Sequence, residues 1–162
     1  MNIALCLDLN FLPYCSATLQ SIIENHSSKD KIHFFITHTF DSKFLTPILG
    51  QISQADHHAS CLSISLDRLR FLKTRAHFTE ASYLRLFLPE LLPKNVTRVL
   101  YLDSDLIVRS DLAELYHEDL HGFSTAMVPE LENKKARQQQ YYNSGVILMD
   151  VQAWRSNKHS KK

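Results

Sequence analysis

The chain has 162 residues, of which 44% are apolar and 22% are charged, and its formal net charge is +1. This composition is typical of one globular domain with a sizeable core. The near-neutral charge gives no global field that would attract nucleic acid or an anionic membrane. No stretch approaches the ~20 consecutive apolar residues of a membrane span. We therefore expect no nucleic-acid partner and no transmembrane segment.

The first half of the chain alternates short apolar runs with amphipathic segments, which predicts strands alternating with helices. Pro13 suits the first turn of a helix, and Asp41 and Ser42 are residues that cap one. In chain order we predict a strand over 3–7, a helix over 14–24, a strand over 32–37, a helix over 41–52 and a strand over 61–66.

The second half is predicted to hold one clear helix and then a strand that ends in acidic residues. The helix opens at Thr79 and is broken near Pro89. The strand over 98–102 runs directly into Asp103 and Asp105. The remaining predictions are an extended piece at 106–108, a helix over 111–116, a strand over 124–128, a polar loop or short helix over 130–140 and a strand over 146–149.

The alternation of strands and helices predicts an α/β domain with a mostly parallel sheet. Ligands of such sheets lie beyond the carboxyl ends of the strands. Asp8 and Asp103 both fall at such ends, so we expect them to face one crevice. The chain has only 3 glycines and no two are close, which disfavours a P-loop and the dinucleotide-binding fingerprint. A bound phosphate would need to be neutralised by other means.

Asp103 and Asp105 form a compact pair of hard oxygen ligands. Residues i and i+2 of an extended backbone point to the same side, and carboxylates suit Mg²⁺ or Mn²⁺. Such an ion would bridge a diphosphate and offset the negative charge that grows on the diphosphate as it leaves. The alternative is a turn in which each Asp binds its own backbone. The apolar runs on both sides favour the metal, because two charges held between them need compensation.

The cysteines Cys6, Cys15 and Cys61 are odd in number and include no C-x-x-C pair. This pattern favours reduced, buried and inert thiols in a cytosolic protein. No basic segment followed by a long apolar run opens the chain, so we expect no signal peptide. We therefore expect a cytoplasmic location.

The segment 98–108, RVLYLDSDLIV, resembles the Asp-x-Asp region of the retaining glycosyltransferases of family 8. That family includes bacterial lipopolysaccharide galactosyl- and glucosyltransferases. Segments 3–11, 82–86 and 142–146 resemble its first strand, its donor-binding helix and its sugar-side stretch, and Trp154-Arg155 continues the match. The resemblance implies a GT-A-type, Rossmann-like nucleotide-sugar-binding part over 1–155, followed by a polar tail over 156–162. It also leaves open peripheral attachment to the inner membrane.

The resemblance implies a role for each of the matching residues. Asp8 would accept a hydrogen bond from uracil, while Asn10 and Phe11 line the nucleotide pocket. Arg85 would pair with a diphosphate or with a carboxylate of the metal site. The implied metal ligands are Asp103 and Asp105, and the residues beside the sugar are Asn143, Ser144 and Gly145. Simpler alternatives are that Asp8 and Asn10 are turn residues, that Arg85 is a solvated helix charge and that 143–145 form a plain β-turn.

The implied activity is metal-assisted transfer of a hexose from UDP-glucose or UDP-galactose to a saccharide acceptor, such as lipopolysaccharide core, with retention. The family's later His-x-Gly-x-x-Lys-Pro-Trp motif is absent, and His159 lacks its companions. We therefore expect the chain to be truncated at its C-terminus, with the catalytic residues outside it. A natural truncation and an artificially shortened chain explain this equally well.

Two other functions stay open. The chain could be a non-catalytic remnant that at most binds a UDP-sugar. A strand followed by Asp-x-Asp also resembles the start of a haloacid-dehalogenase-type phosphatase, whose first Asp is the nucleophile. That family places its Asp pair near the N-terminus, whereas Asp103 lies far along this chain. The phosphatase is therefore the weaker alternative.

Overall fold

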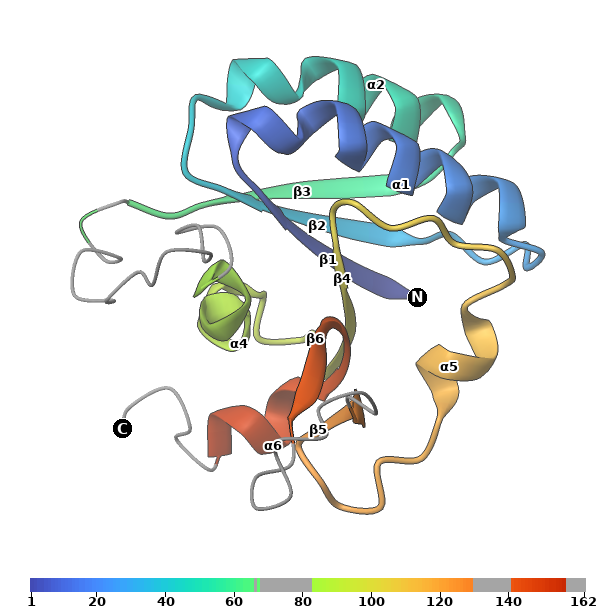
Figure 1. Cartoon of the computed structure of the whole chain (residues 1–162), viewed down its shortest axis with the longest axis vertical. Coiled ribbons are helices and arrows are strands. Elements are labelled where there is room, and N and C mark those ends of the chain that lie inside the picture. Colours follow the sequence, from blue (N-terminus) through green and yellow to red (C-terminus); the bar gives the residue numbers. More distant parts are fainter. Residues whose placement is uncertain (66, 68–82, 130–140, 157–162) are drawn as a thin grey trace.

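A six-stranded sheet runs through the chain in the computed structural model, which describes residues 1–65, 67, 83–129 and 141–156 (Figure 1). The strands are β1 (Asn2–Leu7), β2 (His33–His38), β3 (His58–Ser63), β4 (Arg98–Asp103), β5 (Thr125–Pro129) and β6 (Tyr142–Asp150). They lie in the order β3-β2-β1-β4-β6-β5. Strands β1 to β4 are parallel, and β6 is antiparallel to both β4 and β5. The predicted α/β fold with a mostly parallel sheet is confirmed.

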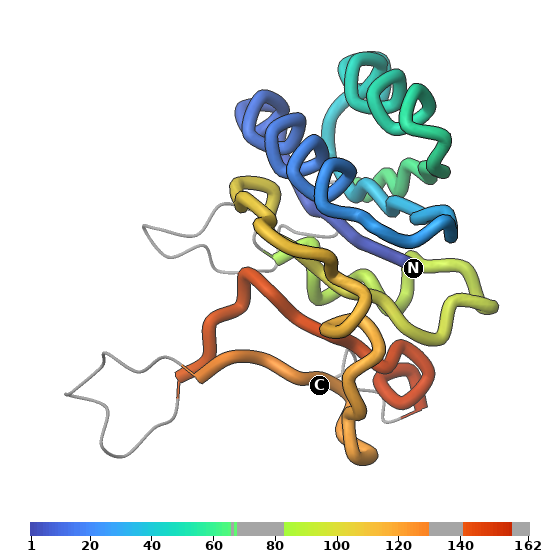
Figure 2. The backbone as a smooth tube through the Cα atoms, turned by 90° about the vertical axis from the view of Figure 1, so that its right-hand side faces the viewer, coloured from blue at the N-terminus to red at the C-terminus, as the bar shows by residue number. Residues whose placement is uncertain are grey.

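Helices α1 (Leu12–Asn25) and α2 (Thr46–Gln54) pack together over one face of the sheet, as Figures 1 and 2 show. Alternate residues of a strand face opposite sides, so β1 supplies two cores. Ile3 and Leu5 pack with Leu19 and Ile22 on the side of these helices. The predicted helix over 41–52 begins with the 3₁₀ turn η2 (Ser42–Leu45), capped by Asp41.

The other face of the sheet is covered by the short elements η4 (Arg85–Phe87), α4 (Leu88–Leu91) and α6 (Val151–Ser156). Here Ala4 and Cys6 of β1 pack with Leu84 and Leu88. A single helix was predicted from Thr79, but the structure has the 3₁₀ turn η4 before α4. The first turn of α4 contains Pro89. The start of the predicted helix over 79–82 lies outside the described residues, as do 130–140 and the end of the polar tail.

Several predicted strand boundaries differ from the structure because pairing between strands sets them. The strand predicted over 61–66 is shifted to β3, which pairs with the whole of β2 from His58 to Ser63. The strand predicted over 146–149 extends back to Tyr142, where β6 pairs with β5 across a register shift. The extended piece at 106–108 joins no sheet. The helix predicted over 111–116 is α5 (Ala113–His117), and Asp111 accepts a hydrogen bond from the Ala113 amide at 2.7 Å.

All three cysteines are free thiols. Cys6 and Cys15 are buried, and burial raises the pKa of each thiol to about 12. The expectation of buried, inert thiols is confirmed for these two. It is wrong for Cys61, which is exposed because β3 is an edge strand. In the part of the chain that the structure describes, no helix has the length and apolar character that a membrane crossing needs.

Candidate functional site

The carboxyl ends of β1 and β4 bring Asp8 and Asp103 to adjacent positions at one edge of the sheet. The two strands are parallel neighbours, with Cys6 opposite Asp103, and Asp8 follows the last residue of β1. The expected placement of these two residues at neighbouring strand ends is confirmed. A parallel sheet offers its ligand site at this edge.

Asp8 shapes the turn that follows β1. Its Oδ1 accepts a hydrogen bond from the Asn10 amide at 2.9 Å, which caps the 3₁₀ turn η1 (Leu9–Phe11). The simpler interpretation of Asp8 as a turn residue is thus correct for one of its oxygens. The turn leaves Asn10 exposed and Phe11 half-buried at the start of α1.

Asn10 and Phe11 share a pocket of about 530 Å³ with Asp105 and Tyr14. The rings of Phe11 and Tyr14 lie 5.6 Å apart between centroids, and Tyr14 is 59% exposed. The fold thus brings one of the two predicted metal ligands beside the predicted nucleotide residues. Tyr14 was not among the predicted site residues, although its i+3 spacing from Phe11 at a helix start was a usable signal.

The Asp103 carboxylate is held through its Oδ1 by two groups. Tyr101 donates its hydroxyl to that oxygen at 2.5 Å, and Arg85 Nη2 lies 3.1 Å from it. The Arg85 guanidinium also lies 4.8 Å from the centroid of the Tyr101 ring and donates to the Ser144 carbonyl. Its side chain is only 12% exposed, so the alternative of a solvated helix charge is wrong. Burial raises the pKa of Tyr101, which keeps the phenol protonated as a donor.

Gly145 lies against the other oxygen of Asp103. A Cβ atom at position 145 would come within 2.8 Å of Asp103 Oδ2 and 3.2 Å of Asn143 Oδ1. The Gly145 amide donates to Asn143 Oδ1 at 2.8 Å. Asn143, Ser144 and Gly145 belong to β6, so the plain β-turn alternative is wrong. Only a residue without a side chain lets this strand approach the carboxylate so closely.

The donor set at this edge fits a hard cation that arrives with a diphosphate. Asp103 Oδ2 is the oxygen left by Tyr101 and Arg85, and Asp105 is exposed on the next turn. Among the residues that the structure describes, no three His, Cys, Asp or Glu side chains gather to hold a metal ion. Mg²⁺ typically uses one or two carboxylates and completes its shell with water and substrate phosphates. Two carboxylates therefore suffice for an ion whose shell is completed by water and phosphate oxygens. They would not suffice for an ion held by protein ligands alone.

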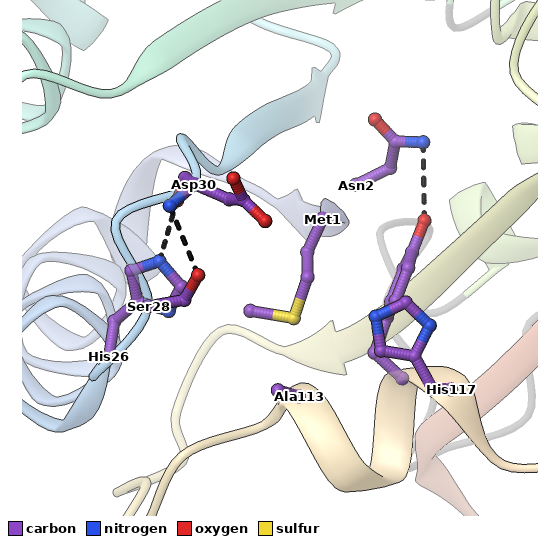
Figure 3. Close-up of a pocket in the computed structure, with 8 residues that line it drawn as sticks. Met1, Asn2, His26, Ser28, Asp30, Ala113 and His117 are labelled. Carbon is purple, nitrogen blue, oxygen red and sulfur yellow. Dashed lines mark hydrogen bonds between the residues drawn. The ribbon is translucent and has the colours of Figure 1, made fainter.

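A second pocket, of about 200 Å³, lies at the opposite edge of the sheet, where β1 begins (Figure 3). Asn2, His26, Asp30, Tyr116 and His117 are among its lining residues. None of the predicted site residues lines it. Asn2 donates to the Tyr116 hydroxyl at 3.3 Å, which ties the start of β1 to α5.

Comparison with known proteins finds one family across nearly the whole chain. Residues 2–162 match the family model described as glycosyl transferase family 8. The chain is 28% identical to the lipopolysaccharide 1,2-glucosyltransferase of Escherichia coli K12, covering 100% of this chain and 51% of that protein. It is 27% identical to the lipopolysaccharide 1,3-galactosyltransferase of Salmonella typhimurium, covering 99% of this chain and 51% of that protein.

The fold has a close counterpart among solved structures. The galactosyltransferase LgtC, solved in complex with donor and acceptor sugar analogs, superposes with a TM-score of 0.84 at 22% identity, covering 96% of this chain and 60% of that one. At that identity the likeness concerns the fold. The chain spans about half the length of the curated relatives cited above.

Proposed function

The chain belongs to glycosyl transferase family 8, and on that premise we propose that it binds a UDP-sugar at the carboxyl edge of β1 and β4. The proposed activity of the whole protein is metal-assisted transfer of the hexose to a saccharide acceptor with retention. One observation carries the proposal: Arg85, Gly145 and Tyr101 converge on the Asp103 carboxylate. In the proposal, residues 1–155 make up the nucleotide-sugar-binding part.

The nucleoside takes the pocket beside the η1 turn. Phe11 and Tyr14 present an aromatic pair, and aromatic rings offer a face on which a base stacks. Asn10 is exposed at the same pocket and supplies polar contacts. The Asp8 oxygen that does not cap the turn accepts the hydrogen bond from uracil. The size of the pocket, about 530 Å³, suits a ligand of this class.

The diphosphate lies between Asp103, Asp105 and Arg85. Asp103 Oδ2 and the Asp105 carboxylate would hold Mn²⁺ or Mg²⁺, and such an ion would supply positive charge to offset that of a leaving diphosphate. Arg85 was expected to pair with a diphosphate or with a metal-site carboxylate, and its contact with Asp103 is the second of these. The guanidinium contacts Asp103 Oδ1, which would leave Oδ2 as the oxygen for a metal ion.

The hexose lies beside β6, where Asn143, Ser144 and Gly145 follow one another. The side-chain oxygen of Asn143 accepts a hydrogen bond from the Gly145 amide. The side-chain nitrogen of Asn143 can then donate to a sugar hydroxyl. The relatives' names include a glucosyltransferase and a galactosyltransferase of lipopolysaccharide. We take UDP-glucose or UDP-galactose as the donor and a lipopolysaccharide-type saccharide as the acceptor. The proposed location of the protein is the cytoplasm, peripheral to the inner membrane.

Calorimetry with UDP in the presence and absence of Mn²⁺ tests the proposal. We expect UDP to bind more tightly with Mn²⁺, and Asp105→Ala to reduce that gain strongly because it removes one of the two carboxylates proposed to hold the ion. Asp119→Ala, which removes an exposed carboxylate from a turn near α5, serves as the control. Equal binding of UDP and Mn²⁺ by the wild type and Asp105→Ala would rule out the metal role.

A further inference from the structure

Helix α1 carries a buried polar stripe that faces the chain segment after β4. Thr18, Ser21 and Asn25 lie on one face of the helix, at spacings of three and four residues. Thr18 is fully buried and Ser21 is 8% exposed. Segment 104–108, which leaves β4 and joins no sheet, runs beneath α1 toward α5 in Figure 1. This segment contains Asp105.

The Thr18 hydroxyl binds the backbone on both sides of Asp105. Its Oγ1 lies 3.0 Å from the Ser104 carbonyl oxygen and 2.8 Å from the Leu106 carbonyl oxygen, and it accepts a hydrogen bond from the Leu106 amide at 3.1 Å. A hydroxyl has one proton and two lone pairs, so the two carbonyls share one donor. A single side chain therefore fixes the two residues that flank the Asp105 carboxylate.

The rest of the stripe continues the same arrangement. Ser21 Oγ accepts from the Val108 amide at 2.9 Å and donates to the Thr18 carbonyl at 2.7 Å. Asn25 donates to the Val108 carbonyl at 3.1 Å. Buried backbone groups need partners, and a segment outside the sheet has no strand to supply them. The helix side chains take the place of a neighbouring strand, and so specify the path of the Asp105 turn.

We infer that Thr18 is a positioning residue for metal binding, an inference that rests on the function proposed above. Asp105 itself is exposed, so no packing of its own side chain orders its carboxylate. The Thr18 hydroxyl orders the backbone on both sides instead and keeps the carboxylate at the pocket shared with Asn10 and Phe11. Groups that orient a metal ligand affect metal affinity by ~10–100-fold when removed.

Three single substitutions in the full chain test this by calorimetry with UDP, each measured with Mn²⁺ and with EDTA. Thr18→Val keeps the shape of the side chain and removes the hydroxyl, whereas Thr18→Ser keeps the hydroxyl. Tyr116→Phe removes a hydroxyl with partly buried hydrogen bonds at the opposite edge of the sheet. We expect Thr18→Val to reduce the Mn²⁺-dependent gain in UDP affinity by ~10–100-fold with unchanged affinity in EDTA. Thr18→Ser and Tyr116→Phe should keep the gain.

The possible results separate this inference from the proposed function. An equal Mn²⁺-dependent gain in the wild type and Thr18→Val overturns the inference alone, as does a loss in Thr18→Ser as large as that in Thr18→Val. No Mn²⁺-dependent gain in the wild type overturns the proposed function and the inference with it. If Thr18→Val does not fold, amide hydrogen exchange of the wild type decides. The Leu106 and Val108 amides should be protected before any ligand is added, and unprotected exchange there overturns the inference.

Discussion

Asp103 is confined on both of its oxygens, and this confinement makes position 145 sensitive to a single methyl group. The added Cβ of Gly145→Ala would lie 2.8 Å from Oδ2, while Tyr101 and Arg85 hold Oδ1 on the other side. The carboxylate cannot rotate away without losing those partners. We expect a loss of ~1–3 kcal/mol in the free energy of unfolding from overpacking, together with loss of Mn²⁺-dependent UDP binding.

Denaturant unfolding and calorimetry measure the two effects of Gly145→Ala. Gly50→Ala is the matched control, because a Cβ at position 50 in α2 has no atom within 4 Å. Replacing glycine by alanine inside a helix adds ~0.5–1 kcal/mol of stability. A Gly145→Ala protein as stable as the wild type and equal to it in UDP binding with Mn²⁺ would show that the contact with Asp103 is unimportant.

The residues of the site differ in how far the sequence reveals them. Asp103 and Asp105 stand out because two charges interrupt an apolar run. Tyr101 has no such signal, since a tyrosine in a buried strand is usually a core residue, and its contact with Asp103 depends on rotamer and pairing. Thr18 is hidden in the same way, because its partner Leu106 is 88 positions further along the chain. A pattern of neighbouring residues does not predict a hydrogen bond between positions so far apart in the sequence.

Asp111 joins two elements, and its titration gives a prediction about pH. It accepts hydrogen bonds from the Ser27 hydroxyl and amide after α1 and from the Ala113 amide of α5. These bonds, led by the one from the Ser27 side chain, lower the pKa of Asp111 from 3.8 to about 2. The folded value lies below the unfolded one. The contribution to stability is therefore complete above about pH 4 and is lost as the pH falls through about 2.

We expect Asp111→Asn to be less stable than the wild type at about pH 7 and to differ less from it near pH 2, where the Asp111 carboxyl of the folded wild type is about half protonated. Urea unfolding at several pH values measures this difference. Asp30→Asn, which changes another exposed acid, controls for the general effect of net charge. A difference between Asp111→Asn and the wild type that stays constant from pH 7 to 2 would refute the link.

The elements were predictable in kind and order, and their boundaries were predictable only where the signal is local. Pro13 and Asp41 mark helix starts that the structure has. The start of β6 depends on pairing with β5 around a register shift, which a single segment does not encode. The apolar run 106–108 suggested a strand, but its backbone is bound by α1 side chains instead. Tertiary partners override local propensity in both cases.

At the scale of the whole molecule, we expect this chain alone to transfer sugar negligibly even when it binds UDP. The leaving diphosphate needs a closed, dry set of preorganised charges. In the described structure Arg85 is engaged with Asp103, and Asp105 is exposed. An exposed carboxylate is surrounded by water and is poorly preorganised, and the loss of one preorganised group typically costs ~100–1,000-fold in rate, so we expect a rate far below that of usual enzymes. A chain that binds a UDP-sugar without transferring the hexose is consistent with this expectation.

Incubation with labelled UDP-glucose or UDP-galactose, Mn²⁺ and a lipopolysaccharide acceptor measures the transfer rate. A preparation of Asp103→Ala gives the background of the assay. Transfer at ~1 per second or faster by the wild type would mean that these 162 residues suffice for catalysis.

We propose above all that UDP and a divalent metal bind together at the carboxyl edge of β1 and β4. Paramagnetic broadening by Mn²⁺ in the presence of UDP, followed in amide NMR spectra, locates the ion directly. We predict that the signals of Asp105 and Gly145 disappear first and that those of His26 and His117, at the opposite pocket in Figure 3, persist. The chain has 9 His residues that offer Mn²⁺ other places. Broadening centred on His26 and His117, or independent of UDP, would contradict the claim.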